Sequence, residues 1–202
     1  MTGLLLLAAL CARGTDTDPQ QGGTESSSSI APFLTLRSGV WAGTGFHFEA
    51  VTGSIRRELD TNALFSAGVD GGVEISKHFV LFGTYEVNLA DDIFCDIAGA
   101  CVGYREYGEE GGNSAVPMET LVYAGGMWGR FDVDAEGLWE FDDAWGLRAG
   151  ISFAWKVGRH LTVDLFGEYR LIEFDYKTKP DSGDDQVGGS SGWVGLGLRY
   201  QF

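Results

Sequence analysis

The sequence lacks several features that would assign its class at once. It has no run of about 18 apolar residues, which excludes a membrane-spanning helix. It contains 4 prolines among 202 residues, so regular elements are seldom interrupted. Its 14 basic residues stand against 29 acidic ones, which gives a net charge of −15. Because nucleic acids need a basic surface, we expect no nucleic acid partner.

Glycine and aromatic residues are abundant. The chain has 31 glycines, and 13% of its residues are aromatic. Disordered segments contain few aromatics, so this composition indicates a folded chain. Many glycines and aromatics with little proline favour regular strands joined by turns. Strands that cross a membrane give a far weaker signal than a spanning helix, so a membrane location stays open.

The first 31 residues differ from the remainder. Residues 4–10 read LLLLAAL and precede small residues, which resembles a signal peptide, although no Lys or Arg comes before the apolar run. We predict a signal peptide over 1–14, a flexible polar leader over 15–31 and a folded domain over 32–202. Lipidation of Cys11 is an alternative, disfavoured because Leu10 occupies a place that normally requires a small residue.

The folded domain alternates between apolar and polar residues with a period of two, as strands do. From Trp145 to Val157 every second residue is apolar, with Arg148 and Lys156 among the interleaved positions. The pattern predicts strands over 33–50, 62–75, 79–90, 117–126, 129–140, 144–157, 161–174 and 190–202.

Short and long connections alternate along the chain. Residues 76–78 and 158–160 are predicted tight turns, whereas 91–117 and 177–189 are predicted long polar loops, as in bacterial outer-membrane barrels. Cys95 and Cys101 fall in the first long loop, and in an exported protein their spacing predicts a disulfide. The alternative is a pair of unbonded thiols.

The apolar and charged rows favour a membrane barrel over a soluble one. A barrel of about eight strands has an interior just wide enough for side chains, so small and oppositely charged residues can fill it while Trp145, Phe153 and Trp155 face lipid. We therefore predict an all-β, transmembrane, antiparallel up-and-down β-barrel of about eight strands. Its expected lumen charge network is Asp70, Glu74, Glu86, Arg130, Asp132, Asp134, Arg148, Lys156, Glu168, Arg170 and Arg199.

The C-terminal decapeptide WVGLGLRYQF carries a family resemblance. Its apolar row is Val194, Leu196, Leu198, Tyr200 and Phe202. This row, with a terminal Phe and a Tyr two residues before it, resembles the closing strand of small OmpA/OmpX-like bacterial outer-membrane barrels. The resemblance implies an outer-membrane location, an even strand count, both termini in the periplasm, and recognition of this strand by the barrel-assembly machinery. The expected interfacial aromatics are Trp139, Trp145, Trp155, Tyr169 and Tyr200.

Two groups of residues resemble functional sites but lack some of the features that those sites require. Residues 132–143 begin D-x-D-x-E-G, as a calcium loop does, but they lack predicted helical flanks, and alternate acids on a strand would face the lumen. His47 shares a strand face with Glu49, yet general-base catalysis also needs a nucleophile and an oxyanion donor. We predict no catalytic, cofactor-binding or metal-binding residue and expect that the protein is not an enzyme.

These patterns favour a structural or surface-interaction protein with a closed lumen, in contact with outer-membrane lipid and lipopolysaccharide. The acidic long loops are interpreted as solvated surface, with divalent cations shared with lipopolysaccharide as the alternative. A small passive channel is the alternative function, and a soluble secreted ligand-binding barrel is the second alternative. The sequence specifies no external ligand or host surface.

Overall fold

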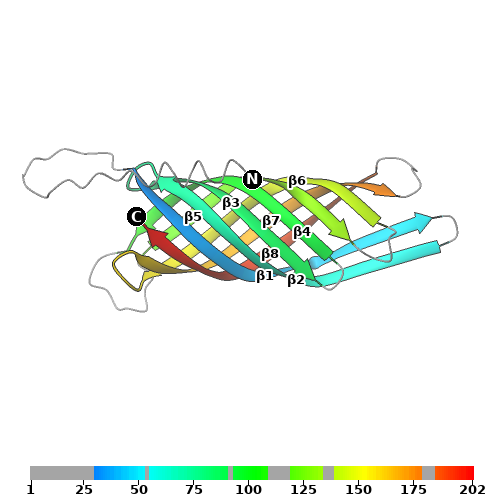
Figure 1. Ribbon diagram of the computed structural model, residues 1–202, viewed down its shortest axis with the longest axis horizontal. Helices are drawn as coiled ribbons and strands as arrows, with labels where there is room; N and C mark the ends of the chain where they lie inside the picture. The colour runs from blue at the N-terminus through cyan, green and yellow to red at the C-terminus, as the bar shows by residue number, and fades with distance from the viewer. Residues whose placement is uncertain (1–29, 53–54, 91–92, 109–118, 134–138, 179–184) are drawn as a thin grey trace, which may run out of the picture.

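The computed structural model describes residues 30–52, 55–90, 93–108, 119–133, 139–178 and 185–202. They form a closed barrel of eight antiparallel strands in sequence order, with β1 pairing β8 (Figure 1). The strands are β1 (Ala31–Thr52), β2 (Ile55–Glu74), β3 (Phe79–Ala90), β4 (Ile93–Tyr107), β5 (Glu119–Val133), β6 (Trp139–Lys156), β7 (Leu161–Thr178) and β8 (Asp185–Gln201). The predicted fold class is confirmed.

Large apolar side chains lie on the outside of the barrel. On β1, Leu36 is 59% exposed, whereas its neighbours Thr35 and Arg37 are buried. On β6, Trp145 is 51% exposed, and the strand alternation places Phe153 and Trp155 on the same outer face. The apolar row therefore faces outward and the polar row inward, as predicted.

Three predicted segments were wrong, although the number of strands was right. The predicted loop over 91–117 contains β4, and the predicted strands over 117–126 and 129–140 are largely one strand, β5. The errors cancelled in the count. β4 gave little contrast because both of its faces carry small residues, such as Ala98 and Ala100 outside and Gly99 inside. The glycines of the GGMWG segment favoured a turn between two strands, but they lie within β5.

The predicted disulfide between Cys95 and Cys101 is also wrong, because the two side chains are not bonded to one another. Both lie on β4 and are buried on its inner face. Six residues of strand separate their Cα atoms by roughly 20 Å. A disulfide requires a Cα separation of less than about 7 Å.

The two ends of the barrel differ. At one end lie the tight turns at residues 75–78 and 157–160, together with the start of β1 and the end of β8, where the Phe202 amide donates to the Pro32 carbonyl at 3.2 Å. At the other end, β1–β8 pairing stops at Gly43 and Ser191, but β1–β2 pairing continues to Thr52 and Ile55. This β1–β2 hairpin projects beyond the closed barrel (Figure 1).

A second projection consists of β6, β7 and β8. Pairing between β6 and β7 reaches Trp139 and Thr178, whereas pairing between β5 and β6 stops at Gly129 and Ala144. The predicted loop over 177–189 thus includes the end of β7 and the start of β8, from Asp185.

The predicted signal peptide and all but the last two residues of the leader lie outside the described residues. Across the segments that the structure describes, no helix is long and apolar enough to span a membrane.

Candidate functional site

The lumen contains seven of the eleven predicted network residues, all buried: Asp70, Glu74, Glu86, Arg148, Glu168, Arg170 and Arg199. Arg130 and Lys156 are exposed, so including them was wrong. Arg130 follows the outward Trp128 by two positions and therefore shares its outer face. Lys156 ends β6 beside a tight turn. The side chains of Asp132 and Asp134 lie outside the described set.

Glu168 is the centre of the larger group of contacts, which we call the central network. Its carboxylate accepts hydrogen bonds from Arg148 Nη2 at 2.7 Å, Arg170 Nε at 2.6 Å and the Tyr123 hydroxyl at 2.8 Å. Arg170 also binds Glu86 through two nitrogens, with Nη2 at 2.8 Å from Oε2. The side chains of Glu168 and Arg170 have no exposed area. Charged groups buried this deeply are tolerated only when they are paired and hydrogen-bonded.

Arg37 extends the central network to β1 and β2. Its Nη2 donates to the Tyr123 hydroxyl at 2.9 Å, and its Nη1 lies 3.2 Å from Asp70. On another side, Arg148 Nη1 donates to Thr84 Oγ1 at 2.7 Å. The central network thus joins strands that are far apart in the sequence.

A second group of ion pairs, the lower network, lies nearer the tight turns. Arg105 pairs with Glu74, and its Nε lies 3.6 Å from Glu119. Arg199 pairs with Glu119 and lies 3.4 Å from Asp164. These contacts connect β2, β4, β5, β7 and β8 across the lumen.

Four network members were not predicted from the sequence: Arg37, Arg105, Glu119 and Asp164. Arg37 and Asp164 occupy polar positions of alternating strands, so the period of two could have identified them. Arg105 and Glu119 belong to segments whose strands were misplaced, and no comparable signal pointed to them.

Aromatic rings contact the arginines of the lumen. The centroid of the Trp193 ring lies 4.3 Å from the guanidinium carbon of Arg37 and 4.2 Å from that of Arg170. Arg37 also lies 3.9 Å from the Phe166 ring centroid, and Arg170 lies 4.9 Å from that of Trp41. Cation–π contacts of this kind gain strength when the groups are desolvated. The lumen is therefore filled by rings as well as by ion pairs, which the sequence analysis did not predict.

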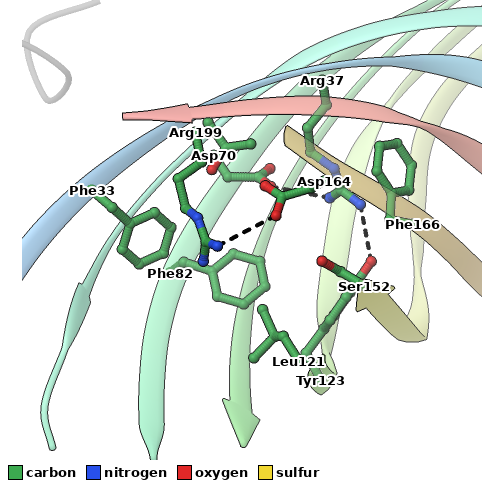
Figure 2. A pocket seen from close by; sticks show the side chains of 11 residues that line it. Phe33, Arg37, Asp70, Phe82, Leu121, Tyr123, Ser152, Asp164, Phe166 and Arg199 are labelled. Carbon is green, nitrogen blue, oxygen red and sulfur yellow. Dashed lines mark hydrogen bonds and ion pairs between the residues drawn. The ribbon is translucent and has the colours of Figure 1, made fainter. Parts of the chain in front are cut away.

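A small cavity lies between the two networks. Figure 2 shows Arg37 and Arg199 directed toward carboxylates in this cavity, with Phe82 and Phe166 among its walls. The volume open to the centres of water molecules is about 30 Å³. A single water needs roughly 10–15 Å³ by this measure, so the space suits a few waters.

The other candidate sites remain without structural support. The side chains of His47 and Glu49, and most of the calcium-like segment 132–143, lie outside the described set. Among the described side chains, no group of three or more His, Cys, Asp or Glu residues is arranged to hold a metal ion.

The residues of the predicted assembly signal lie on the outer face of β8, except Phe202, which directly follows the strand. Val194 is 61% exposed and Phe202 is 60% exposed. Their role in assembly stays a prediction. Of the expected interfacial aromatics, Trp145, Tyr169 and Tyr200 are exposed and Trp155 is half-buried, while the side chain of Trp139 is outside the described set.

No protein-family model matches the sequence. No curated protein sequence matches it. The resemblance to the OmpA/OmpX-like family therefore stays a prediction at the level of family.

Three solved structures resemble the barrel. Outer membrane protein OprG from Pseudomonas aeruginosa is 13% identical, with a TM-score of 0.51 over 84% of this chain and 96% of its own. The N-terminal β-barrel domain of Pseudomonas aeruginosa OprF is 10% identical, with a TM-score of 0.54 over 85% and 97%. Outer membrane protein AlkL, determined in lipid bilayers, is 11% identical, with a TM-score of 0.56 over 93% and 97%. The chain therefore has the fold of small bacterial outer-membrane β-barrels.

Proposed function

We propose that this protein spans a bacterial outer membrane as a closed, non-conducting barrel and acts as a structural or surface-interaction protein. The observation that carries the proposal is the lumen, where paired charges and aromatic rings occupy the space that a pore would need. The proposal assigns no catalytic activity and no cofactor.

The outer surface supports a lipid environment. Leu147 and Leu196 are each 59% exposed, and Val122 is 53% exposed. In water, an exposed apolar area that surrounds the molecule would promote aggregation. In a bilayer it contacts hydrocarbon, while the charged side chains stay inside the barrel.

The balance of charge supports a closed lumen. The central and lower networks together contain five arginines and six carboxylates. A conducting path would have to separate these buried pairs, and breaking one such pair costs about 3–5 kcal/mol. The rings of Trp193 and Phe166, with centroids 4.4 Å apart and planes inclined by 55°, add a further obstruction.

The two projections support a role on the side opposite the tight turns. The β1–β2 hairpin continues beyond the last β1–β8 pair, Gly43 and Ser191, and therefore presents strand edges outside the closed barrel. We propose that these projections contact lipopolysaccharide or an external partner. We further propose that the C-terminal strand is recognised by the barrel-assembly machinery.

Location is tested first. Membrane fractionation combined with gel mobility before and after heating should place the protein in the outer membrane as a heat-modifiable band. Recovery in the soluble periplasmic fraction would refute the membrane assignment and favour the soluble ligand-binding alternative.

Conductance is tested next in planar bilayers. The wild type should show no stable open level, whereas Arg148→Ala should produce current because it opens the central network. Lys156→Ala, which changes an exposed cation, is the matched control and should stay closed. A stable pore in the wild type, altered by Arg148→Ala, would instead establish the channel alternative.

A further inference from the structure

The two tight turns carry the same arrangement of side chains on opposite sides of the barrel. One turn joins β2 to β3 and contains Lys77 and His78, and the other joins β6 to β7 and contains Arg159 and His160. In a closed barrel of eight strands, elements four strands apart lie across from each other. Each turn thus presents a basic residue followed by a histidine.

In the first turn, His78 is fixed to the neighbouring strand by two hydrogen bonds. Its carbonyl accepts from the Arg105 amide at 2.6 Å, and its Nδ1 lies 2.9 Å from the Arg105 carbonyl. The imidazole stacks on the ring of Tyr104, with centroids 5.4 Å apart and an interplanar angle of 14°. Tyr104 is 49% exposed on the outer face, which places the imidazole at the edge of the apolar belt.

The second turn repeats the two hydrogen bonds of the first. The His160 carbonyl accepts from the Gln201 amide at 2.9 Å, and His160 Nδ1 lies 3.1 Å from the Gln201 carbonyl. The imidazole lies against Tyr200, with centroids 5.8 Å apart, and is more tilted than in the first turn, at an interplanar angle of 34°. Tyr200, like Tyr104, precedes the residue that bonds to the histidine and is 45% exposed.

These hydrogen bonds define the imidazole tautomer. A backbone carbonyl only accepts, so Nδ1 must carry the proton in both rings. In the neutral ring, Nε2 is then an acceptor. Neither Nε2 has a hydrogen-bond partner within the described segments. The preceding cations, Lys77 and Arg159, are both exposed.

We propose that each turn binds the phosphoethanolamine headgroup of a bilayer lipid. Lys77 or Arg159 binds the phosphate, and the histidine Nε2 accepts a hydrogen bond from the ammonium group. The exposed tyrosine contacts the same lipid at the boundary between headgroup and hydrocarbon. A choline headgroup has no ammonium N–H to donate, and a glycerol headgroup has no cation. Neither headgroup can therefore bind both the basic residue and the histidine Nε2. This inference rests on the proposed membrane location.

The first site has an additional feature that favours a zwitterionic headgroup. Glu106 is exposed and lies two positions beyond Tyr104, on the same face of β4. A carboxylate there attracts the ammonium and disfavours a purely anionic headgroup. Phe202 occupies the corresponding position beyond Tyr200, so the second site relies on Arg159 and His160.

The test uses the full chain folded in dodecylphosphocholine micelles, whose headgroup is choline. Dihexanoyl phosphatidylethanolamine is added while the ¹⁵N shifts of the histidine side chains are followed by NMR. We expect saturable shifts at the Nε2 atoms of His78 and His160. Equal amounts of dihexanoyl phosphatidylcholine should leave both unchanged.

Two double variants separate the contacts. Lys77→Gln with Arg159→Gln should raise the half-saturating lipid concentration about tenfold, the effect of one hydrogen bond to a charged group. His78→Asn with His160→Asn retains a donor for the carbonyl but removes Nε2. Since this variant lacks the reporting atom, retention of phosphatidylethanolamine over phosphatidylcholine is measured by native mass spectrometry and should fall about fivefold.

Arg130→Gln, which changes an exposed cation toward the opposite end of the barrel, is the matched control and should bind as the wild type does. Three results would overturn the inference: non-saturable shifts, equal responses to the two lipids, or unchanged binding by both double variants. The histidines would then serve only to hydrogen-bond each turn to the neighbouring strand. A protein that shows these results yet still inserts and gives a heat-modifiable band retains the proposed function. Failure to insert would refute the proposed function itself.

Discussion

Replacing Glu168 by glutamine removes the central carboxylate of the lumen with almost no change in shape. In the wild type, Arg148 and Arg170 both donate to this carboxylate, at 2.7 and 2.6 Å, and Arg37 lies 3.7 Å from it. After the change, these three cations keep Glu86 and Asp70 as their nearby anions. Because the Arg148 and Arg170 side chains are fully buried, we expect Glu168→Gln to lower the free energy of unfolding by about 3–5 kcal/mol.

Urea unfolding in phospholipid vesicles measures this loss, with tryptophan fluorescence and gel mobility as two independent probes. With a denaturant dependence of about 2 kcal/mol per molar urea, the midpoint should fall by roughly 1.5–2.5 M. Glu173→Gln, at an exposed position on the same strand, is the matched control and should change the stability by less than about 0.5 kcal/mol. Combining Glu168→Gln with Arg148→Met should restore part of the loss. A Glu168→Gln barrel as stable as the wild type would refute the reasoning.

Three further predictions use the same unfolding assay. Gly125→Ala should lower the free energy of unfolding by about 1–3 kcal/mol, because its Cβ would lie 2.7 Å from Cys101 Sγ. The control Gly126→Ala should be neutral or slightly stabilising, because its Cβ would have no atom within 4 Å. Equal effects of the two changes would contradict the assigned inner and outer faces of β5. Ile151→Arg should cost roughly 2–4 kcal/mol if the outer face meets lipid, with Ile151→Leu as the control, and a neutral arginine would argue against the membrane. A reducing agent should leave the unfolding midpoint unchanged, since Cys95 and Cys101 are not bonded to one another; losing a disulfide would cost about 2–5 kcal/mol.

The barrel could be predicted because strand alternation is a local signal. Trp145 and Leu147 on one face and Arg148 on the other determine which side of β6 turns inward, whatever the remaining strands do. The signal fails where both faces carry small residues. In β4, Ala98, Gly99 and Ala100 follow each other without contrast, so the strand was interpreted as a loop.

The candidate site was predictable in composition but not in its pairings. Alternation indicated that Glu168 and Arg170 face the lumen, but which cation meets which anion depends on the shear of the closed barrel, and the sequence does not encode that directly. Trp193 was missed for another reason. Aromatic residues were expected at the membrane interfaces, yet Trp193 shares its face with Gly195 and Arg199 and is fully buried. Gly39 on β1 leaves room for this ring, because a Cβ there would lie 2.8 Å from Trp193 Nε1.

The pairing of the first strand with the last constrains how the protein can form. Phe33 meets Gln201 in the register, so the decisive contact joins nearly opposite ends of the chain. Contacts of such long sequence separation form slowly, because the entropy of closing the chain is lost before they can stabilise it. A chain stopped before β8 would leave β1 and β7 as bare sheet edges and would remove Arg199 from Glu119 and Asp164. A barrel without free sheet edges therefore requires β8, and a chain that lacks this strand remains an open sheet with edges that can aggregate.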